Sequence, residues 1–273
     1  MNTKKVIPIL LTASVDPHGM VGAKFTVEVR EQMYVDTLLY YISLFMNDKG
    51  VQPLVFCENS GWFISSICEK VGHFPENVPI EYISINPELF DNTKGKGYNE
   101  FKMIDIALEQ SDIVKQYNCF FKVTGRFPIL NVNNLLMEVK NREVFRADCK
   151  DHRVYEWLHI PINGHVGECR FFYCTNDFYK QYFRGRYSEL NDYEGRIAEM
   201  LMLDVIRSTK GQPGVSGRYR TQPLFSGCGG HSLGTNSKGW RAFFYSTDND
   251  SLALRLKGQV RQLCRWIFPF WWC

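Results

Sequence analysis

Residues 6–15 read VIPILLTASV, a nearly continuous apolar run. A run of this kind is typical of a β-strand that is buried on both faces of a parallel sheet. The polar turn Asp16-Pro17-His18-Gly19 follows it, and apolar residues then recur at helical spacing over residues 28–46. The stretch therefore predicts the first β-α unit of an α/β fold.

Further apolar runs alternate with segments of helical periodicity along the chain. Strands are expected at residues 53–57, 79–85, 118–124, 143–148 and 170–175. Helices are expected at residues 28–46, 64–71, 99–117, 133–140, 176–184 and 192–208. Repeated β-α units predict a mostly parallel, Rossmann-type sheet flanked by helices. We expect one α/β domain at residues 1–250, followed by a tail at residues 251–273.

The composition argues against several classes of protein. The net charge of +3 is too small for a dedicated nucleic-acid binder, which usually carries a strongly basic domain. The nine cysteines contain no CxxC pair, so the sequence shows neither metal-ligand spacing nor a clear disulfide framework. The first apolar run is too short to span a membrane and meets Asp16 and Pro17 before any cleavage site. We therefore expect a reduced, cytoplasmic protein.

A glycine-lysine loop follows the third predicted strand. Gly95-Lys96-Gly97-Tyr98 continues to Glu100 with the pattern GxGxxE, which is neither the dinucleotide fingerprint nor a P-loop. Glycine N–H groups at the start of a helix, together with lysines, would hold a phosphate. In the alternative interpretation, the glycines only permit a turn and Lys94 and Lys96 stay in water.

A second cationic segment ends the fourth predicted strand. Lys122, Thr124 and Arg126 alternate on one face of the strand end. A lysine inside an apolar strand needs an anion, which would be either a bound phosphate or a neighbouring carboxylate. Arg126 suits bidentate contact with a phosphate.

Polar residues also follow the first two strands, at the edge where parallel sheets bind ligands. Thr12 and Asp16 end the first strand, and Glu58 and Asn59 follow the second. Asn59 or Ser60 would cap the next helix, or Glu58 and Asn59 would line a pocket.

Carboxylates that could activate a hydroxyl group occur later in the chain. Asp148 and Asp151 flank the end of the fifth strand, whereas Asp192, Glu194 and Glu199 lie near the start of a helix. Such positions usually only favour the helix dipole, but one of these carboxylates would serve as a general base. Our candidates are Asp148 and Glu194.

The C-terminal tail, residues 251–273, has a composition of its own. Leu256, Val260, Leu263 and Ile267 fall on one helical face, arginines and a lysine lie largely on the other, and the chain ends in FPFWWC. A basic amphipathic helix with terminal aromatic residues is typical of a helix that lies on an anionic membrane surface. Alternatively, the tail packs against its own domain or a dimer partner.

Several of these segments together resemble a family of bacterial glycosyltransferases that build capsule or O-antigen polysaccharides. The similarity covers roughly residues 6 to 217, and residues 213–217 are compatible with it. It rests on four segments, TASVDP (12–17), FCENSG (56–61), GKGYNE (95–100) and KVTGR (122–126).

The resemblance implies a GT-A-like fold, a nucleotide-sugar donor and a lipid-linked glycan acceptor, so that the enzyme would lie peripherally on the inner membrane. Such folds often hold a divalent metal through a DxD motif after a mid-sheet strand, but here that strand runs into KVTGR. Asp248-Asn249-Asp250 matches DxD only by letters, so we predict no metal site and no required cofactor. Lys122, Arg126 and the amides of the glycine loop would neutralise the leaving diphosphate instead. Thr12, Asp16, Glu58 and Asn59 would shape the nucleoside or sugar pocket. On the same resemblance, residues 1–150 would form the nucleotide-binding half and about 151–250 the acceptor half.

Two rival functions remain open at this point. A nucleotidyltransferase on a similar sheet would need carboxylate-bound magnesium. A non-catalytic module would bind anionic glycans or lipid headgroups without turnover.

Overall fold

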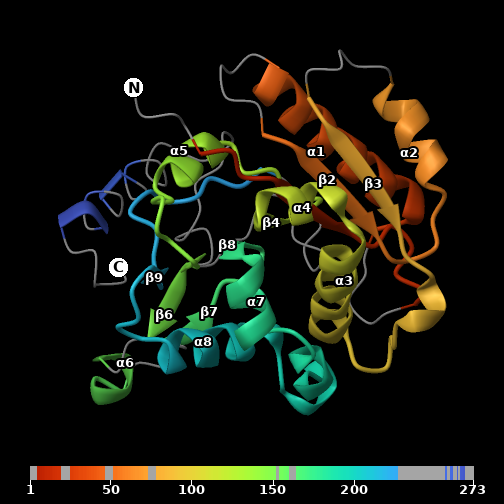
Figure 1. Ribbon diagram of the computed structural model, residues 1–273. Coiled ribbons are helices and arrows are strands. Elements are labelled where there is room, and N and C mark those ends of the chain that lie inside the picture. Colours follow the sequence, from red (N-terminus) through yellow and green to blue (C-terminus); the bar gives the residue numbers. More distant parts are fainter. Residues whose placement is uncertain are drawn as a thin grey trace.

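The computed structural model describes residues 5–19, 25–46, 52–72, 78–151, 154–159 and 164–226, together with positions 256, 259, 260, 263 and 265–267. Its main sheet has the strand order β3-β2-β1-β4-β8-β5-β9 (Figure 1). The seven strands are β1 (Ile9–Ala13), β2 (Leu54–Glu58), β3 (Ile80–Ser84), β4 (Cys119–Thr124), β5 (Phe145–Arg146), β8 (Phe171–Thr175) and β9 (Val215–Ser216). β1, β2, β3 and β4 are mutually parallel, whereas β8 runs antiparallel to β4 and β5. The predicted α/β fold with a mostly parallel sheet is confirmed.

Helices cover both faces of this sheet. α1 (Val27–Met46), α2 (Ile64–Val71) and α5 (Val132–Met137) contribute to the hydrophobic cluster on one face. α3 (Lys96–Gln110), α4 (Asp112–Tyr117), α7 (Asn176–Tyr182) and α8 (Ala198–Ser208) contribute to the cluster on the other. The short helix α6 (Val154–Trp157) and the two-stranded sheet of β6 (Cys149–Asp151) and β7 (His165–Gly167) lie near α8 in Figure 1.

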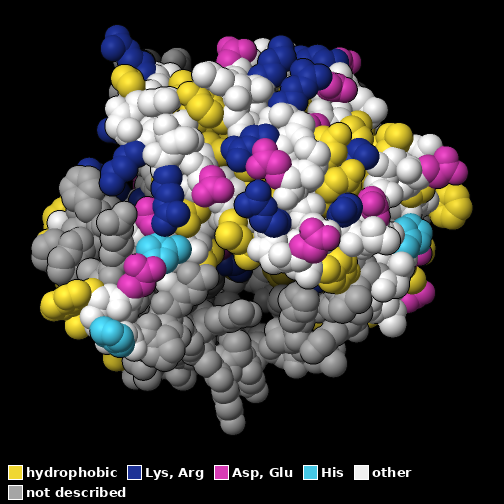
Figure 2. Space-filling model, turned by 90° about the horizontal axis from the view of Figure 1, so that it is seen from below, with side chains coloured by type: hydrophobic (Ala, Val, Ile, Leu, Met, Phe, Trp, Pro, Cys, Tyr) yellow, Lys and Arg dark blue, Asp and Glu magenta, His cyan; other side chains and the backbone are white. Residues whose placement is uncertain are grey.

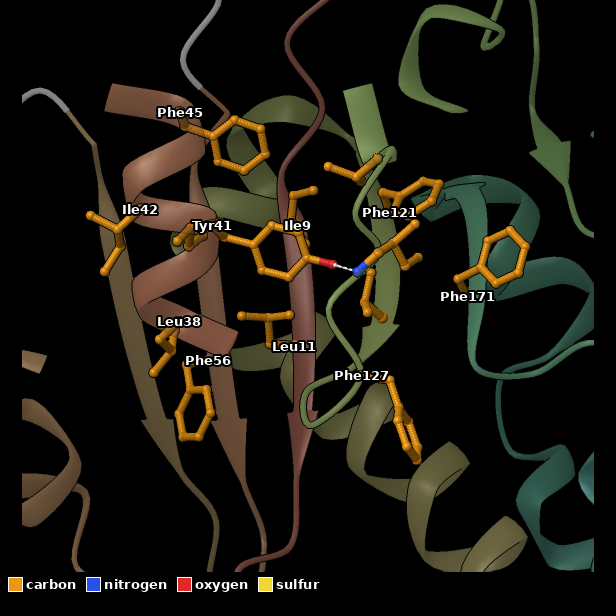
Figure 3. Close-up of a cluster of buried hydrophobic side chains, with 14 of the residues drawn as sticks. Ile9, Leu11, Leu38, Tyr41, Ile42, Phe45, Phe56, Phe121, Phe127 and Phe171 are labelled. Carbon is orange, nitrogen blue, oxygen red and sulfur yellow. Dashed lines mark hydrogen bonds between the residues drawn. The ribbon is translucent and has the colours of Figure 1, made fainter. Parts of the chain in front are cut away.

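The apolar run at the N-terminus supplies both clusters because side chains alternate along a strand. Ile9 and Leu11 of β1 face the α1 side, and Leu10 faces the α3 side. Figure 3 shows Tyr41 of α1 lying over β1, where its hydroxyl accepts a hydrogen bond of 2.9 Å from the backbone N–H of Ile129. β1 is therefore buried on both faces, as an interior strand of the sheet between β2 and β4. The candidate functional site lies at its carboxyl end.

Two predicted helices are each divided in the structure. The helix expected at residues 99–117 is wrong as a single element, because Ser111 ends α3 and its Oγ accepts a hydrogen bond from Val114 N at the start of α4. The helix expected at 192–208 begins as the 3₁₀-helix η3 (Asp192–Glu194), which ends at Gly195 with φ 81°. Only α8 continues as an α-helix.

Charged side chains of both signs lie on the face that Figure 2 shows. In the view from below, Lys and Arg side chains are interspersed with Asp and Glu (Figure 2). Within the described residues, no helix has the length and apolar character needed to cross a membrane.

Candidate functional site

A cavity of about 120 Å³ opens at the carboxyl ends of β1 and β4, beside the start of α3. Its lining brings together five of the predicted site residues: Thr12, Asn59, Lys96, Thr124 and Arg126. Sequence reasoning did not select the other lining residues: Ala13, Ser14, Pro17, Arg30, Tyr34, Asn99, Glu100 and Met103. A larger cavity of about 360 Å³ lies among α3, α4 and α7 and is lined by none of the predicted site residues. The smaller cavity is therefore the candidate site.

Three cationic side chains line this cavity: Arg30, Lys96 and Arg126. Arg30 is only 6% exposed as a residue. Its guanidinium is held by the β1–α1 loop, because Nε donates to Val15 O at 2.8 Å and Nη2 donates to Ser14 O. Among the described residues, neither Arg30 nor Arg126 forms an ion pair with a carboxylate.

The cations disfavour one another's charge. Burial, assisted by the Arg126 and Arg30 guanidinium groups, lowers the pKa of the Lys96 ammonium below its ordinary value. Burial, with a contribution from Arg126, likewise lowers the pKa of Arg30. A bound anion would relieve this repulsion, so the cluster has the electrostatic character of an anion site.

Two buried polar atoms at the cavity have no hydrogen-bond partner among the described residues. They are Nε of Arg126, whose guanidinium lies 5.0 Å from the centre of the Phe127 ring, and Oδ1 of Asn59. An unsatisfied buried polar group costs about 1–3 kcal/mol, so native structures rarely retain one without a reason. One orphan is a charged donor and the other is an acceptor, which suits a ligand that carries both an anion and an N–H or O–H group.

The anion that meets Lys122 is a carboxylate of the same chain. Lys122 is 0% exposed, and its Nζ donates to Glu100 Oε1 at 2.6 Å, to Thr124 Oγ1 at 2.9 Å and to Cys169 O at 2.7 Å. Thr12 Oγ1 also donates to Glu100 Oε1, at 2.9 Å. The prediction that Lys122 contacts the ligand is corrected: Lys122 does not line the cavity and pairs with Glu100, which does.

The glycine loop also finds its anion within the chain. Asp192 Oδ2 accepts hydrogen bonds from Lys96 N at 2.7 Å and Gly97 N at 3.1 Å. A Cβ atom at Gly95 would lie 2.6 Å from Asp192, so this close approach requires glycine, which also has a φ of 93°. The predicted amide cradle for a diphosphate is therefore wrong, because the Asp192 carboxylate caps the start of α3. Tyr98 packs edge-on against Tyr187, with ring centroids 5.3 Å apart, and does not line the cavity.

Glu58 and Asp16 do not line the cavity; they make hydrogen bonds that hold the loops beside it. Glu58 is 0% exposed and accepts hydrogen bonds from Val15 N at 3.1 Å, from Ser60 N at 2.9 Å and from Trp62 N at 3.2 Å. Asp16 N donates to Ser60 Oγ at 2.9 Å, which ties the loop after β1 to the loop after β2. We expected Glu58 and Asp16 to shape a nucleoside or sugar pocket; neither lines this cavity, and both hold the loops beside it.

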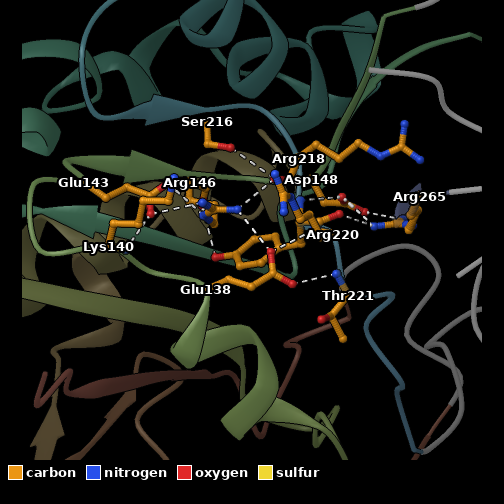
Figure 4. A network of polar contacts seen from close by, with 11 residues as sticks. Glu138, Lys140, Glu143, Arg146, Asp148, Ser216, Arg218, Arg220, Thr221 and Arg265 are labelled. Carbon is orange, nitrogen blue, oxygen red and sulfur yellow. Dashed lines mark hydrogen bonds and ion pairs between the residues drawn. The ribbon is translucent and has the colours of Figure 1, made fainter. Parts of the chain in front are cut away.

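Neither predicted general base reaches the cavity. Asp148 is 1% exposed, and both of its carboxylate oxygens accept hydrogen bonds from Arg265, at 3.0 and 2.9 Å. Figure 4 shows Arg265 pointing at Asp148, beside Arg146 with its partners Glu138 and Glu143. Glu194 is exposed on η3 and is absent from the cavity lining. Burial and ion pairing exclude Asp148 as a base, and position argues against Glu194.

Arg30 could have been found from the sequence. It lies four residues before Tyr34 and eight before Leu38, both buried on the inner face of α1. A cation on the apolar face of a helix indicates a buried partner or a ligand.

The candidate site thus takes one cationic side chain from each of three segments: Arg30 from α1, Lys96 from α3 and Arg126 from just after β4.

The residues at the carboxyl end of β4 and just after it do not fit a divalent metal. Thr124, Gly125 and Arg126 supply no carboxylate, and Oε1 of the nearby Glu100 is already bound to Lys122. Within the described ranges, no group of three or more His, Cys, Asp or Glu side chains is placed to hold a metal ion. Asp248-Asn249-Asp250 lies outside the described residues.

No family model matches the chain, and no curated protein matches it. Solved structures do match. The apo form of the bifunctional glycosyltransferase WbbM matches at 8% identity and a TM-score of 0.43, over 79% of this chain and 39% of that chain, so this chain spans less than half of it. The galactosyltransferase LgtC in complex with donor and acceptor sugar analogs matches at 9% identity and a TM-score of 0.45, over 77% of this chain and 72% of that chain. Core-mannan synthase A from Aspergillus fumigatus, in its Mn/GDP form, matches at 10% identity and a TM-score of 0.45, over 94% of this chain and 84% of that chain.

Proposed function

We propose that this chain is a glycosyltransferase that moves a sugar from a nucleotide-sugar donor to a glycan acceptor. The observation that carries the proposal is the cluster of Arg30, Lys96 and Arg126 in a cavity at the carboxyl ends of parallel strands. The donor's diphosphate would lie among these cations. Its nucleoside would lie toward Asn59 and the residues after β1.

In this proposal, the fixed cations do the chemical work at the donor. When the bond from the sugar to the diphosphate breaks, negative charge grows on the leaving phosphate. Arg30 is pre-positioned by two backbone carbonyls, so it can stabilise that charge without reorganising. Arg126 would bring its unsatisfied Nε to the same group. Because these cations supply the positive charge, we propose transfer without a divalent metal.

The finer parts of the proposal rest on the sequence. The resemblance to polysaccharide glycosyltransferases supports a lipid-linked acceptor and a role in bacterial surface polysaccharide synthesis. The tail would bring the enzyme to the inner membrane. Of its described positions, Leu256, Val260, Leu263, Trp266 and Ile267 are exposed, whereas Arg265 is buried against Asp148. Most of the tail lies outside the described residues.

A thermal-shift screen tests the proposal, with UDP-, GDP-, CMP- and dTDP-sugars, each with and without manganese. We expect one nucleotide class to raise the melting temperature without manganese, and the matching donor to be hydrolysed slowly in the absence of an acceptor. Stabilisation only by a nucleoside triphosphate with magnesium, and EDTA-sensitive turnover, would favour a nucleotidyltransferase. Binding without any hydrolysis or transfer would favour a non-catalytic module.

A further inference from the structure

One carboxylate lies within the cationic cavity. Glu100 of α3 lines it together with Arg30, Lys96 and Arg126, and it is the sole Asp or Glu in the lining formed by described residues. A fixed negative charge beside an anion site weakens the binding of a bare anion. The pairing of Glu100 with Lys122 accounts for the charge, but not for the placement of the carboxylate in the lining of the cavity.

The hydrogen bonds of Glu100 are all on one oxygen. Oε1 accepts from Thr12 Oγ1 at 2.9 Å, from Lys122 Nζ at 2.6 Å and from Thr124 Oγ1 at 3.0 Å. No described group donates to Oε2, and the side chain keeps 23% of its surface exposed. The three donors come from β1 and β4, so they fix the carboxylate in a single orientation.

We propose that Glu100 is a specificity-determining residue whose Oε2 accepts a hydrogen bond from a sugar hydroxyl of the bound diphosphate ligand. This inference rests on the proposed function, because it assumes that the three cations hold the diphosphate. A pre-positioned charged acceptor rewards a ligand that brings a hydroxyl group to this place, and its charge penalises a ligand that does not. The site thereby selects glycosylated diphosphates over pyrophosphate and other bare anions.

The hydroxyl could belong to the ribose or to the transferred sugar. Both present the same chemistry to Oε2, so nucleotide analogues are needed to separate them. UDP and GDP differ from their 2′-deoxy counterparts by one ribose hydroxyl. UDP-glucose and GDP-mannose differ from UDP and GDP by the hexose.

Titration calorimetry of the full chain with pyrophosphate and these nucleotides tests the inference, in the wild type and in Glu100→Gln. We expect Glu100→Gln to bind pyrophosphate more tightly, by at least about fivefold, because a like charge is removed. It should bind the preferred sugar nucleotide about tenfold less tightly relative to pyrophosphate, because a charged acceptor is lost. A pyrophosphate-to-sugar-nucleotide affinity ratio that is unchanged from wild type would overturn the inference.

The variant leaves Lys122 buried without its carboxylate, so it could fail to fold. In that case Glu100→Gln combined with Lys122→Met takes its place. It leaves the net charge of the pair unchanged, so pyrophosphate should bind about as in wild type, while the sugar nucleotide should still bind less tightly relative to pyrophosphate because the charged acceptor is lost. Lys94→Met is the matched control: it lies in the same loop as Lys96 but does not line the cavity, and its ratio should equal that of wild type. In the wild type, weaker binding of a 2′-deoxy nucleotide than of its ribose counterpart would assign the hydroxyl to the ribose. Weaker binding of UDP or GDP than of UDP-glucose or GDP-mannose would assign it to the hexose.

The two proposals fail in different ways. If Arg126→Gln abolishes pyrophosphate binding but Glu100→Gln leaves the ratio unchanged, the diphosphate site stands and the role of Glu100 falls. If wild type binds neither pyrophosphate nor any nucleotide, the diphosphate site falls and the inference falls with it.

Discussion

Lys122→Met should lower the stability of the protein through the loss of one buried ion pair. Lys122 is 0% exposed, and the substitution keeps its aliphatic volume but removes an ammonium that makes three hydrogen bonds. Breaking a buried pair by removing one partner costs about 3–5 kcal/mol. Glu100 keeps 23% of its surface exposed, so water can replace part of the lost interaction, and we expect the lower end of this range.

For a chain near this size, about 3 kcal/mol corresponds to a fall in melting temperature of roughly 6–12 °C. Differential scanning calorimetry and urea unfolding would measure it, with Lys94→Met as the control that should change the free energy of unfolding by less than about 0.5 kcal/mol. Combining Lys122→Met with Glu100→Gln should recover part of the loss, because it removes the carboxylate left without its cation. If Lys122→Met unfolds at the wild-type temperature but binds nucleotide poorly, Lys122 contacts ligand and the structural role assigned to it is wrong.

Three further predictions follow from the surroundings of the site. The pKa of Lys96 is lowered by burial and by the neighbouring guanidinium groups, so the affinity for a diphosphate should fall as the pH rises through that lowered pKa. Lys96→Arg should abolish this fall in affinity, because arginine stays charged over that range. Titration calorimetry between pH 7 and about pH 10 would measure both proteins, and an equal decline in both would contradict the prediction. Asp192→Ala removes the cap of α3 and should cost about 0.5–2 kcal/mol in urea unfolding, and an unchanged free energy of unfolding would show that the cap contributes nothing. Burial raises the pKa of Glu199, so this carboxyl contributes its full stability only below its unfolded pKa, and the contribution is lost as the pH rises through the folded pKa. Glu199→Gln should therefore be more stable than wild type at neutral pH but not at acidic pH. A stability difference between the two proteins that is constant across pH would refute the raised pKa of Glu199.

The fold was largely predictable because its signals are local and repeated. Apolar runs that alternate with helical periodicity located β1 to β4, and the positions of these strands in the structure agree with the expectation to within a few residues. The break at Ser111 was missed because a serine within a long helical pattern reads equally well as an interior residue and as a cap.

The site was predictable only in part, because the spacing of residues in the sequence does not show which side chains form hydrogen bonds or ion pairs with one another in the fold. The structure brings Thr12, Asn59, Lys96, Thr124 and Arg126 to one cavity at an edge of the sheet, because parallel strands end together; their role in ligand binding stays a prediction.

The errors arose where the chain supplies its own counter-ion from far away. Glu100 reaches Lys122, Asp192 reaches the amides of the glycine loop, and Arg265 reaches Asp148 across a separation of 117 residues. A lysine or a carboxylate that looks unpaired in the sequence can therefore be fully satisfied in the fold.

In the proposed function Arg30, Lys96 and Arg126 hold the diphosphate of a nucleotide sugar, and titration calorimetry of Arg126→Gln is the sharpest test of this role. The nucleotide diphosphate preferred by wild type should bind Arg126→Gln at least about tenfold more weakly, as for a lost charged hydrogen bond, while Lys94→Met should bind it as wild type does. Equal affinity in wild type and Arg126→Gln, with both proteins folded, would contradict it.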